Sequence, residues 1–343
     1  MTTDSATRAL RVAPVPACPA CGTTGATLHD ELRDQLFGVP GTWRIVRCHD
    51  PACSVLWLDP APVEEDLGLA YHRYYTHDVP DRAPARTLGG PWGWVKQGHL
   101  SRCFGYPVPA AGLKRVLALL LAPFPTRREN LDRLVMHLPA RARGRVLDVG
   151  CGDGSTLDTL AQLGWQVEGV DFDPAVVEGL ARRGFHVRLG TLEAQRYPDG
   201  GFDAVTACHV LEHVREPGAF LRECHRILRP GGTLAILTPN AQGLGHRRFG
   251  PAWRGLEPPR HLQVLTAPAL DRLAEQAGFP ERRLRSSARM AAFIHRQSRN
   301  LERGTPDART SGLAAGCFQL DERRRLLTDP WAGEELLLVA SRR

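Results

Sequence analysis

The stretch VLDVGCGDGS, from Val146 to Ser155, decides the fold prediction. An apolar strand pattern runs directly into Gly150, Gly152 and Gly154, and a helical pattern, STLDTLAQLG, follows. A glycine-rich turn between a first strand and a first helix is where a doubly wound α/β sheet binds a nucleotide-like ligand, because the backbone must approach that ligand closely. The stretch therefore predicts a nucleotide-type site at the end of this strand.

The spacing of the glycines argues against a dinucleotide. The dinucleotide fingerprint is G-x-G-x-x-G, and Ser155 stands where its third glycine should fall. Further along, WQVEGVDFDP places Asp171 at the end of the second strand, where a carboxylate can accept hydrogen bonds from both ribose hydroxyls of a nucleoside. A helix cap is the alternative role, but Asp173 before Pro174 suits a cap better.

Strand and helix patterns alternate around this turn. A helix is expected near residues 126–138, and strands and helices then alternate as far as APALDRLAEQAG. This alternation predicts a mainly parallel, doubly wound α/β sheet covered by helices on both faces. The final EELLLVASRR is expected to be an antiparallel edge strand. The predicted units are a small module (1–80), a linker with an amphipathic helix (81–125) and the α/β domain (126–343).

Four motifs resemble those of class I S-adenosylmethionine-dependent methyltransferases: VLDVGCGDGS, VEGVDFDP, FDAVTACHVLEHV and LRPGGTLAILTPN. The resemblance implies a seven-stranded Rossmann-like sheet that binds S-adenosylmethionine as methyl donor. It also implies that the glycines make room for the methionine part, that an aspartate lies near its ammonium group, that another holds the ribose, and that the end of the third strand lies near the adenine. The residues given these roles are Asp148, Gly150, Gly152, Gly154, Asp171, Thr191 and Leu192.

The stretch ACHVLEHVREP follows the fourth strand, where the resemblance places the methyl acceptor. Imidazole accepts a proton near neutral pH, so His213 and His209 are candidate general bases. A structural role is the alternative for each. Glu212 and His213 could instead ligate a divalent ion.

The long segment after the fifth strand, TPNAQGLGHRRFGPAWRGLEPPRHLQVLT, is expected to fold over the acceptor. Trp253, Arg260 and His261 are candidate acceptor contacts, and His261 is a third candidate base; packed loop residues are the alternative. The family's Asn/Asp-Pro-Pro-aromatic motif for nucleobase amines does not follow the fourth strand, where the sequence reads CHVLEH. Methylation of base amines is therefore disfavoured.

Four cysteines cluster near the start of the sequence, in CPACG and RCHDPACSV. Zinc prefers four tetrahedral thiolates, so these residues predict a structural zinc site, with His49 as a possible substitute ligand and unmetallated thiols as the alternative. No thioredoxin-like pattern surrounds them, which disfavours a redox pair. The predicted ligands are Cys18, Cys21, Cys48 and Cys53.

The cysteine module resembles the zinc-ribbon-like amino-terminal module of several bacterial methyltransferases, including sugar C-methyltransferases and a class of ribosomal RNA guanine methyltransferases. An aromatic cluster in AYHRYYTHDVP follows it. These side chains either approach the acceptor, as the resemblance implies, or form an interface between module and α/β domain. The cluster comprises Tyr71, His72, Tyr74, Tyr75 and His77.

Charge and hydropathy restrict the partners. The formal net charge is +7, but its arginines are scattered and Lys96 and Lys114 are the only lysines, which disfavours a nucleic-acid partner. The longest apolar run, residues 116–124, is far shorter than the roughly 20 residues that span a bilayer. The helical pattern Leu113–Phe124 could touch a membrane, although core packing is favoured. No signal peptide is visible and the nine cysteines do not form a secreted framework, so a cytoplasmic location is expected.

Together these patterns predict methyl transfer to oxygen or carbon of a small or carrier-linked metabolite, such as a sugar, polyketide or lipid-linked intermediate. An RNA methyltransferase that grips RNA through the cysteine module is one alternative. A non-catalytic, zinc-dependent binding protein is the other. The sequence does not define the oligomeric state.

Overall fold

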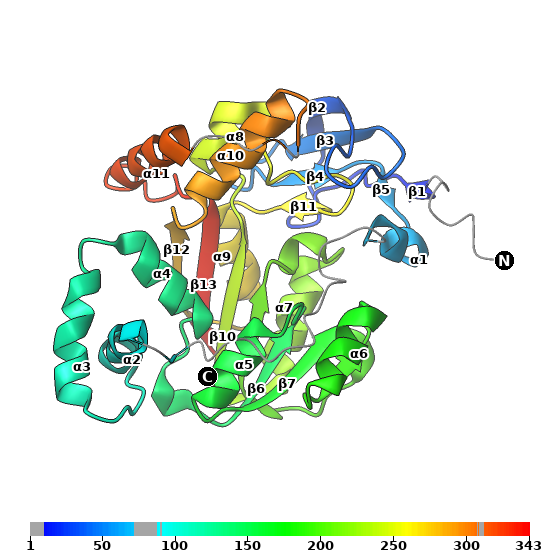
Figure 1. Cartoon of the computed structure of the whole chain (residues 1–343). Helices are drawn as coiled ribbons and strands as arrows, with labels where there is room; N and C mark the ends of the chain where they lie inside the picture. The colour runs from blue at the N-terminus through cyan, green and yellow to red at the C-terminus, as the bar shows by residue number, and fades with distance from the viewer. Residues whose placement is uncertain (1–9, 72–87, 90, 307, 309–311) are drawn as a thin grey trace.

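A seven-stranded sheet forms the centre of the computed structural model, which describes residues 10–71, 88, 89, 91–306, 308 and 312–343 (Figure 1). The strand order is β12-β13-β10-β9-β6-β7-β8. All neighbouring pairs from β10 to β8 are parallel, and β13 is antiparallel to both of its neighbours. The predicted Rossmann-like sheet is therefore confirmed. Its strands are β6 (Arg145–Val149), β7 (Gln166–Asp171), β8 (Val187–Leu189), β9 (Phe202–Cys208), β10 (Leu228–Pro239), β12 (Glu281–Ser287) and β13 (Glu335–Ser341).

The alternation of side chains along β10 gives the sheet two apolar faces. Leu234 and Ile236 pack with residues of α7 (Pro217–Ile227) and α9 (Ala267–Gln276), whereas Ala235 and Leu237 pack with residues around α5 (Ser155–Gln162). Further short elements around the sheet are α4 (Pro125–Leu134), η4 (Ala140–Ala142), α6 (Pro174–Arg182), η5 (Glu193–Gln195) and η6 (Leu211–His213).

The edge of the sheet differs from the expectation. The final strand β13 is antiparallel as predicted, but it lies between β10 and β12, so β12 is the edge. The physical reason lies in the side chains: β13 is buried along most of its length, whereas β12, ERRLRSS, alternates charged exposed positions with partly buried ones. An edge strand tolerates such charges and a central one does not.

The helix starts agree with the local sequence. Asp173 is the N-cap of α6, its side chain accepts a hydrogen bond from the backbone N–H of Ala175 at 2.9 Å, and Pro174 begins the helix. This arrangement leaves Asp171, at the end of β7, available for another role.

The cysteine region forms a second sheet, of four antiparallel strands in the order β11-β4-β3-β2. Its strand β11 comes from the long segment after β10, and Figure 1 shows this sheet above the main sheet, on the side where β10 leads into α8. The module is thus joined to the α/β domain through a shared sheet. Its elements are β1 (Val12–Ala13), β2 (Gly25–Leu32), β3 (Trp43–Cys48), β4 (Leu56–Leu58), β5 (Ala61–Pro62), α1 (Glu64–Leu67), η1 (Gly68–Tyr71) and β11 (Gln263–Val264), and β1 pairs with β5.

Helices outside this frame complete the fold. Two of them, α2 (Pro91–Phe104) and α3 (Ala111–Leu117), lie side by side at one end of the molecule, with η3 (Ala118–Leu121) continuing α3 (Figure 1). The long segment after β10 contains α8 (Leu244–Phe249) and η7 (Gly250–Ala252), and α10 (Ala291–Glu302) and α11 (Gly312–Arg325) precede β13. None of the helices in the described part of the chain combines the length and the hydrophobicity that a membrane-spanning segment requires.

Candidate active site and cysteine centre

The glycine loop leaves the carboxyl end of β6 in a conformation that needs glycine. Gly150, Gly152 and Gly154 all have positive φ, at 66°, 49° and 74°. A Cβ at Gly150 would collide with Val210, and one at Gly154 would collide with Leu180. A Cβ at Gly152 would meet no atom within 4 Å. The middle glycine therefore faces open space, where a ligand can approach the backbone.

Two buried aspartates flank this loop. The Asp171 carboxylate accepts a hydrogen bond from the backbone N–H of Gly152 at 3.0 Å and another from Asp173 at 3.0 Å, and burial raises its pKa. Asp148 accepts a hydrogen bond from the Thr206 hydroxyl at 2.6 Å. Burial raises the pKa of Asp148 to about 7 although the Thr206 hydrogen bond lowers it, and the nearby Asp171 adds a smaller increase. A cationic ligand would stabilise both carboxylates.

The two residues predicted to lie beside the adenine, Thr191 and Leu192, differ in their exposure to solvent. The backbone N–H of Gly190 donates to the Asp171 carbonyl at 2.8 Å, which holds this segment against the end of β7. Thr191 is exposed, whereas Leu192 is buried in the core of the sheet. Thr191 can therefore face a ligand with its side chain, and the Leu192 side chain supports the segment from within.

Phe172 is an additional candidate that the sequence motifs did not single out. It follows Asp171 directly, is 45% exposed, and stacks edge-on with Tyr71 at a ring-centre distance of 4.8 Å. A large exposed aromatic ring beside a ribose-type carboxylate is suited to contact a nucleobase. Its position after the strand-end aspartate is the sequence signal for this role.

Tyr71 also contacts the predicted acceptor side. Its hydroxyl lies 2.8 Å from Nδ1 of His213, and the same nitrogen lies 2.9 Å from the Arg260 carbonyl oxygen. Because a carbonyl only accepts, this geometry assigns the hydrogen to Nδ1 and leaves the lone pair of neutral His213 on Nε2. The other members of the predicted aromatic cluster, His72, Tyr74, Tyr75 and His77, lie outside the described residues.

His209 is bound on both sides by carboxylates. Its Nδ1 lies 3.0 Å from Glu212 and its Nε2 lies 2.9 Å from Glu335. Burial alone would lower the pKa of His209, but these hydrogen bonds raise it well above the ordinary value. Attraction to His209, joined at Glu335 by Arg289, lowers the pKa of Glu212 and of Glu335 to about 2 in spite of their burial. His209 is thus an imidazolium with both nitrogens engaged, which suits positioning of Glu212 better than proton abstraction.

His261 comes from the turn before β11 and lies against His213, with ring centres 4.8 Å apart. Its Nδ1 donates to the Gly255 carbonyl at 2.8 Å, and burial lowers its pKa to about 4. Ligand atoms of His261, His213 and Glu212 lie within 4.8 Å of one another, so the three residues could hold a cation. The Glu212 carboxylate is already engaged by His209 and by the Thr238 hydroxyl at 3.0 Å.

Two predicted acceptor contacts are instead structural. Arg260 is fully buried, binds Asp34 of the cysteine module with both terminal nitrogens at 2.8 and 2.9 Å, and donates to Glu257 at 3.0 Å. Trp253 is buried and donates to Glu334 at 2.9 Å. Neither side chain is free to contact an acceptor, because each satisfies a buried carboxylate. Their role is to hold the loop that carries His261.

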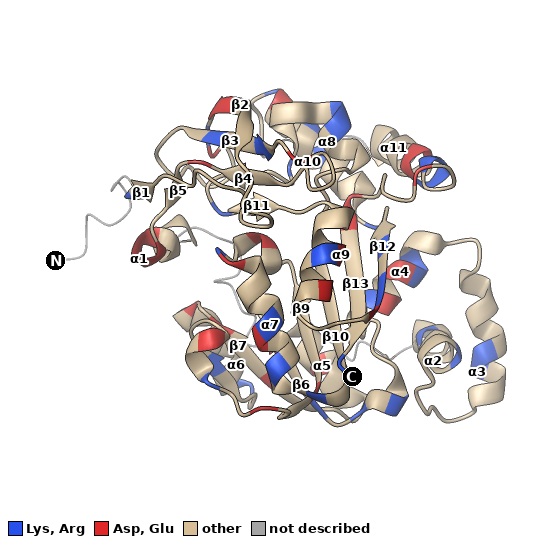
Figure 2. Cartoon of the chain, turned by 180° about the vertical axis from the view of Figure 1, so that it is seen from behind, with Lys and Arg blue, Asp and Glu red and all other residues tan. Residues whose placement is uncertain are grey.

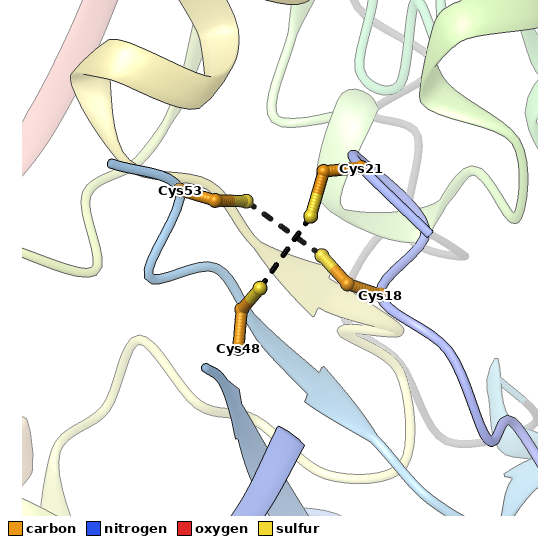
Figure 3. A group of neighbouring side chains, drawn as sticks. All are labelled: Cys18, Cys21, Cys48 and Cys53. Atoms are coloured by element: carbon orange, nitrogen blue, oxygen red, sulfur yellow. Dashed lines mark hydrogen bonds between the residues drawn. The ribbon is translucent and has the colours of Figure 1, made fainter. Parts of the chain in front are cut away.

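The four cysteine side chains converge on one point (Figure 3). Sγ of Cys18 lies 3.7 Å from that of Cys53, and Sγ of Cys21 lies 3.4 Å from that of Cys48. These separations are too long for disulfides and close to the roughly 3.8 Å edges of a tetrahedron with Zn–S bonds of about 2.3 Å. His49 is exposed and its Nδ1 lies 3.4 Å from the Thr24 hydroxyl, so it is not directed into this centre. The donor set fits zinc.

The main sheet has the Rossmann-like arrangement, and the glycine loop after β6 lacks the dinucleotide fingerprint. The family model described as a methyltransferase domain matches residues 125–280. This match agrees with the class I S-adenosylmethionine-dependent methyltransferase that the motifs predicted.

Two curated relatives and one solved structure illustrate the similarity. A protein of Mycolicibacterium smegmatis described as "Probable S-adenosylmethionine-dependent methyltransferase" is 33% identical over 50% of this chain and 65% of its own length. The "Ubiquinone biosynthesis O-methyltransferase" of Xanthomonas oryzae pv. oryzae is 41% identical over 29% of this chain and 44% of its own length. The matches thus span less than two thirds of either relative. An S-adenosylmethionine-dependent methyltransferase structure from Mesorhizobium loti aligns with a TM-score of 0.43 and 19% identity, covering 62% of this chain and 97% of that one.

Proposed function

We propose that this protein transfers the methyl group of S-adenosylmethionine to an oxygen or an acidic carbon of a small or carrier-linked acceptor. The observation that carries the proposal is the pairing of a donor loop with an oriented histidine. A Cβ at Gly152 would meet open space, the Asp171 carboxylate accepts a hydrogen bond from the Gly152 N–H, and Tyr71 lies between Phe172 on the donor side and His213. Tyr71 thus contacts residues of both the donor half and the acceptor half of the site.

The donor half of the site supplies charge and room. S-adenosylmethionine carries an ammonium and a sulfonium group, and in this proposal Asp148 balances the ammonium charge. Asp171 would hold the ribose, and Gly150, Gly152 and Gly154 would let the backbone approach the methionine part. The segment of Thr191 and Leu192 would border the adenine, with Phe172 against its ring. Positioning contributes most here, because the sulfonium is already a strong electrophile.

The acceptor half supplies a base. His213 presents Nε2 with a lone pair, because Nδ1 is held by the Arg260 carbonyl. As the acceptor oxygen or carbon forms its bond to the methyl carbon, the carbon–sulfur bond breaks and S-adenosylhomocysteine leaves. The acceptor proton passes to Nε2 of His213. His209 acts as a positioning residue through Glu212, and His261 packs against the base.

The ubiquinone O-methyltransferases among the relatives support an oxygen acceptor. An RNA acceptor is less well supported, because the sequence CHVLEH after the fourth strand of the α/β pattern lacks the Asn/Asp-Pro-Pro-aromatic motif for nucleobase amines. We also propose that Cys18, Cys21, Cys48 and Cys53 hold a structural zinc ion, which would fix β3 and β4 beneath the acceptor segment.

The test is a radiolabelled methyl-transfer assay with phenols, carbon acids, sugars and RNA as separate acceptor sets. For the acceptor that is methylated, His213→Asn should lower kcat by about 10²- to 10⁴-fold and leave the donor Kd unchanged, as expected for loss of a general base. Tyr71→Phe should cost less, since the carbonyl of Arg260 still orients the ring. Labelling of RNA alone, or full activity of His213→Asn, would contradict the proposal. A cation at Glu212, His213 and His261 would reveal itself as activity that a chelator removes and magnesium restores.

A further inference from the structure

The segment between residues 82 and 128 carries all of the chain's excess positive charge. It contains eight Lys or Arg residues and no Asp or Glu, against a formal net charge of +7 for the whole chain. Figure 2 shows blue but no red on α2 and α3. The first acidic residues beyond the segment are turned inward: Glu129 binds Arg323 at 2.6 Å and Asp132 binds His99 at 2.6 Å.

The same segment exposes an unusual amount of apolar surface. Seven of the fourteen large apolar side chains that are exposed in the described part of the chain lie between residues 92 and 124. The prediction that the helix Leu113–Phe124 packs in the core is therefore wrong. The exposed residues are Trp92 (60%), Trp94 (48%), Leu113 (55%), Val116 (61%), Leu119 (49%), Leu120 (59%) and Phe124 (48%).

The helix pair is built so that this surface faces outward. Lys114, Ala118 and Leu121 form the buried side of α3 and η3. Lys114 donates to Gln97 of α2 at 2.5 Å and lies 5.3 Å from the Trp94 ring centre. A Cβ at Gly98 would collide with the Lys114 backbone, so the two helices pack as closely as glycine allows. The residues at spacings of three and four, Leu113, Val116 and Leu120, are left on the opposite, solvent side.

We propose that α2, α3 and η3 form a docking surface for a bilayer that contains anionic lipid. Apolar side chains on a helix that lies along the interface enter the boundary between headgroups and acyl chains, tryptophan prefers that depth, and basic residues are attracted to the anionic headgroups. Exposed Arg102, Arg115, Arg127 and Arg128 belong to the same segment as the apolar stripe. A second copy of this chain is a poorer partner, because its matching face would be equally basic and the like charges would repel.

Sedimentation of the full-length protein with vesicles tests this inference. Vesicles of equal parts phosphatidylcholine and phosphatidylglycerol should bind the protein, vesicles of phosphatidylcholine alone should bind it much less, and salt should weaken binding. Trp43, Trp57, Trp165 and Trp253 are buried. Anionic vesicles should therefore protect chiefly Trp92 and Trp94 from acrylamide quenching, and the W92F/W94F variant should lose that protection.

Matched variants distinguish binding through this surface from nonspecific adsorption of the protein to vesicles. Leu119→Glu with Leu120→Glu should weaken vesicle binding by at least about tenfold, because two apolar side chains become charged. Arg115→Gln with Arg127→Gln should weaken it by about fivefold per charge lost. The control is Leu313→Glu with Leu327→Glu, which changes leucines that are 83% and 85% exposed elsewhere. Circular dichroism and S-adenosylmethionine binding check that each variant is folded.

Binding that is weakened in the variants of Leu119, Leu120, Arg115 and Arg127, and unchanged in the control variant, supports the inference. No binding to anionic vesicles, or an equal loss in the control variant, overturns it. Light scattering during gel filtration measures whether the protein forms an oligomer. If the wild-type protein is an oligomer that does not bind vesicles, and the variant Leu119→Glu with Leu120→Glu is a monomer, then a second copy covers this face and the inference is overturned. None of these readouts depends on methyl transfer.

Discussion

Asp148 illustrates how burial prepares a carboxylate for a cationic ligand. It is 3% exposed, and Thr206 is the hydrogen-bond donor to its side chain. Its pKa of about 7 means that, in the free protein, a proton competes with any cation for the carboxylate near neutral pH. Binding of the donor should therefore be linked to loss of this proton.

This linkage predicts the pH dependence of donor binding. The raised pKa leaves Asp148 increasingly neutral as the pH falls below about 7, so affinity for S-adenosylmethionine should fall by up to about tenfold per pH unit there and level off above it. Titration calorimetry between about pH 5.5 and 8.5 measures this dependence. Asp148→Asn should weaken binding and flatten the profile. Asp153→Asn, which changes an exposed aspartate of the same loop, should preserve it; an unchanged profile in Asp148→Asn would refute the assignment.

The residues of the donor half could be predicted from sequence, since glycine spacing and strand-end carboxylates are local features, and their role in donor binding stays a prediction. It could not distinguish a free histidine from a fixed one. His209 lies between Glu212 and Glu335, and Glu335 is more than 100 residues away in the sequence. Arg260 was a candidate acceptor contact, but its partner Asp34 comes from the cysteine module. Long-range pairings of buried charges decide these roles, and no local pattern predicts them.

The glycine loop needs glycine at Gly150 and at Gly152 for two different reasons. Gly150 needs its small size because Val210 fills the space beside it, whereas Gly152 has only its backbone conformation and open space around it. The loop thus combines a packing requirement with a ligand requirement.

Alanine at each position should expose this difference. Gly150→Ala should lower the melting temperature substantially, because the positive φ costs about 1–2 kcal/mol and the methyl group collides with Val210. Gly152→Ala should show the smaller loss of stability but should lose S-adenosylmethionine binding, because its Cβ would occupy the donor space. Thermal unfolding and calorimetry on both variants test this. Full donor binding by Gly152→Ala would show that the ligand does not lie against this loop.

The periodicity of apolar residues predicted the helices and strands themselves better than it predicted which strands lie next to each other in the sheet. The alternation from β6 to α9 was recovered because each strand is an apolar run followed by an amphipathic helix. The edge strand β12 was not predicted, because ERRLRSS contains a single apolar residue, and α10 and α11 were not predicted either. The place of β13 inside the sheet depends on β12, so it could not be inferred separately.

The whole molecule is organised around the contact between the cysteine module and the acceptor segment. Strand β11 of that segment pairs with β4, the Leu58 N–H donates to Leu262 at 2.9 Å, and Thr266 donates to the Cys53 carbonyl at 2.5 Å. The cysteine centre is thus directly connected to the segment that carries His261. Loss of zinc should affect both stability and acceptor chemistry.

Zinc removal should show this coupling. Cys21→Ser should lower the metal content from about one zinc per chain, lower the melting temperature, and reduce turnover more than donor affinity, because the donor loop lies on the main sheet. Metal analysis, thermal unfolding and calorimetry provide the readouts. Cys103→Ser, which changes an exposed cysteine outside the centre, is the control and should have no effect on metal content. A Cys21→Ser protein with wild-type stability and no metal would contradict a structural role for zinc.

The loop from Gly150 to Gly154 is expected to bind a sulfonium nucleoside, and a calorimetric titration of the full-length protein can measure this binding without an acceptor. S-adenosylmethionine and S-adenosylhomocysteine should bind with micromolar affinity, NAD should not bind, and Asp171→Ala should abolish binding while the protein remains folded. No binding of either sulfur nucleoside, or unchanged binding in Asp171→Ala, would mean that this loop is not the site of the methyl donor.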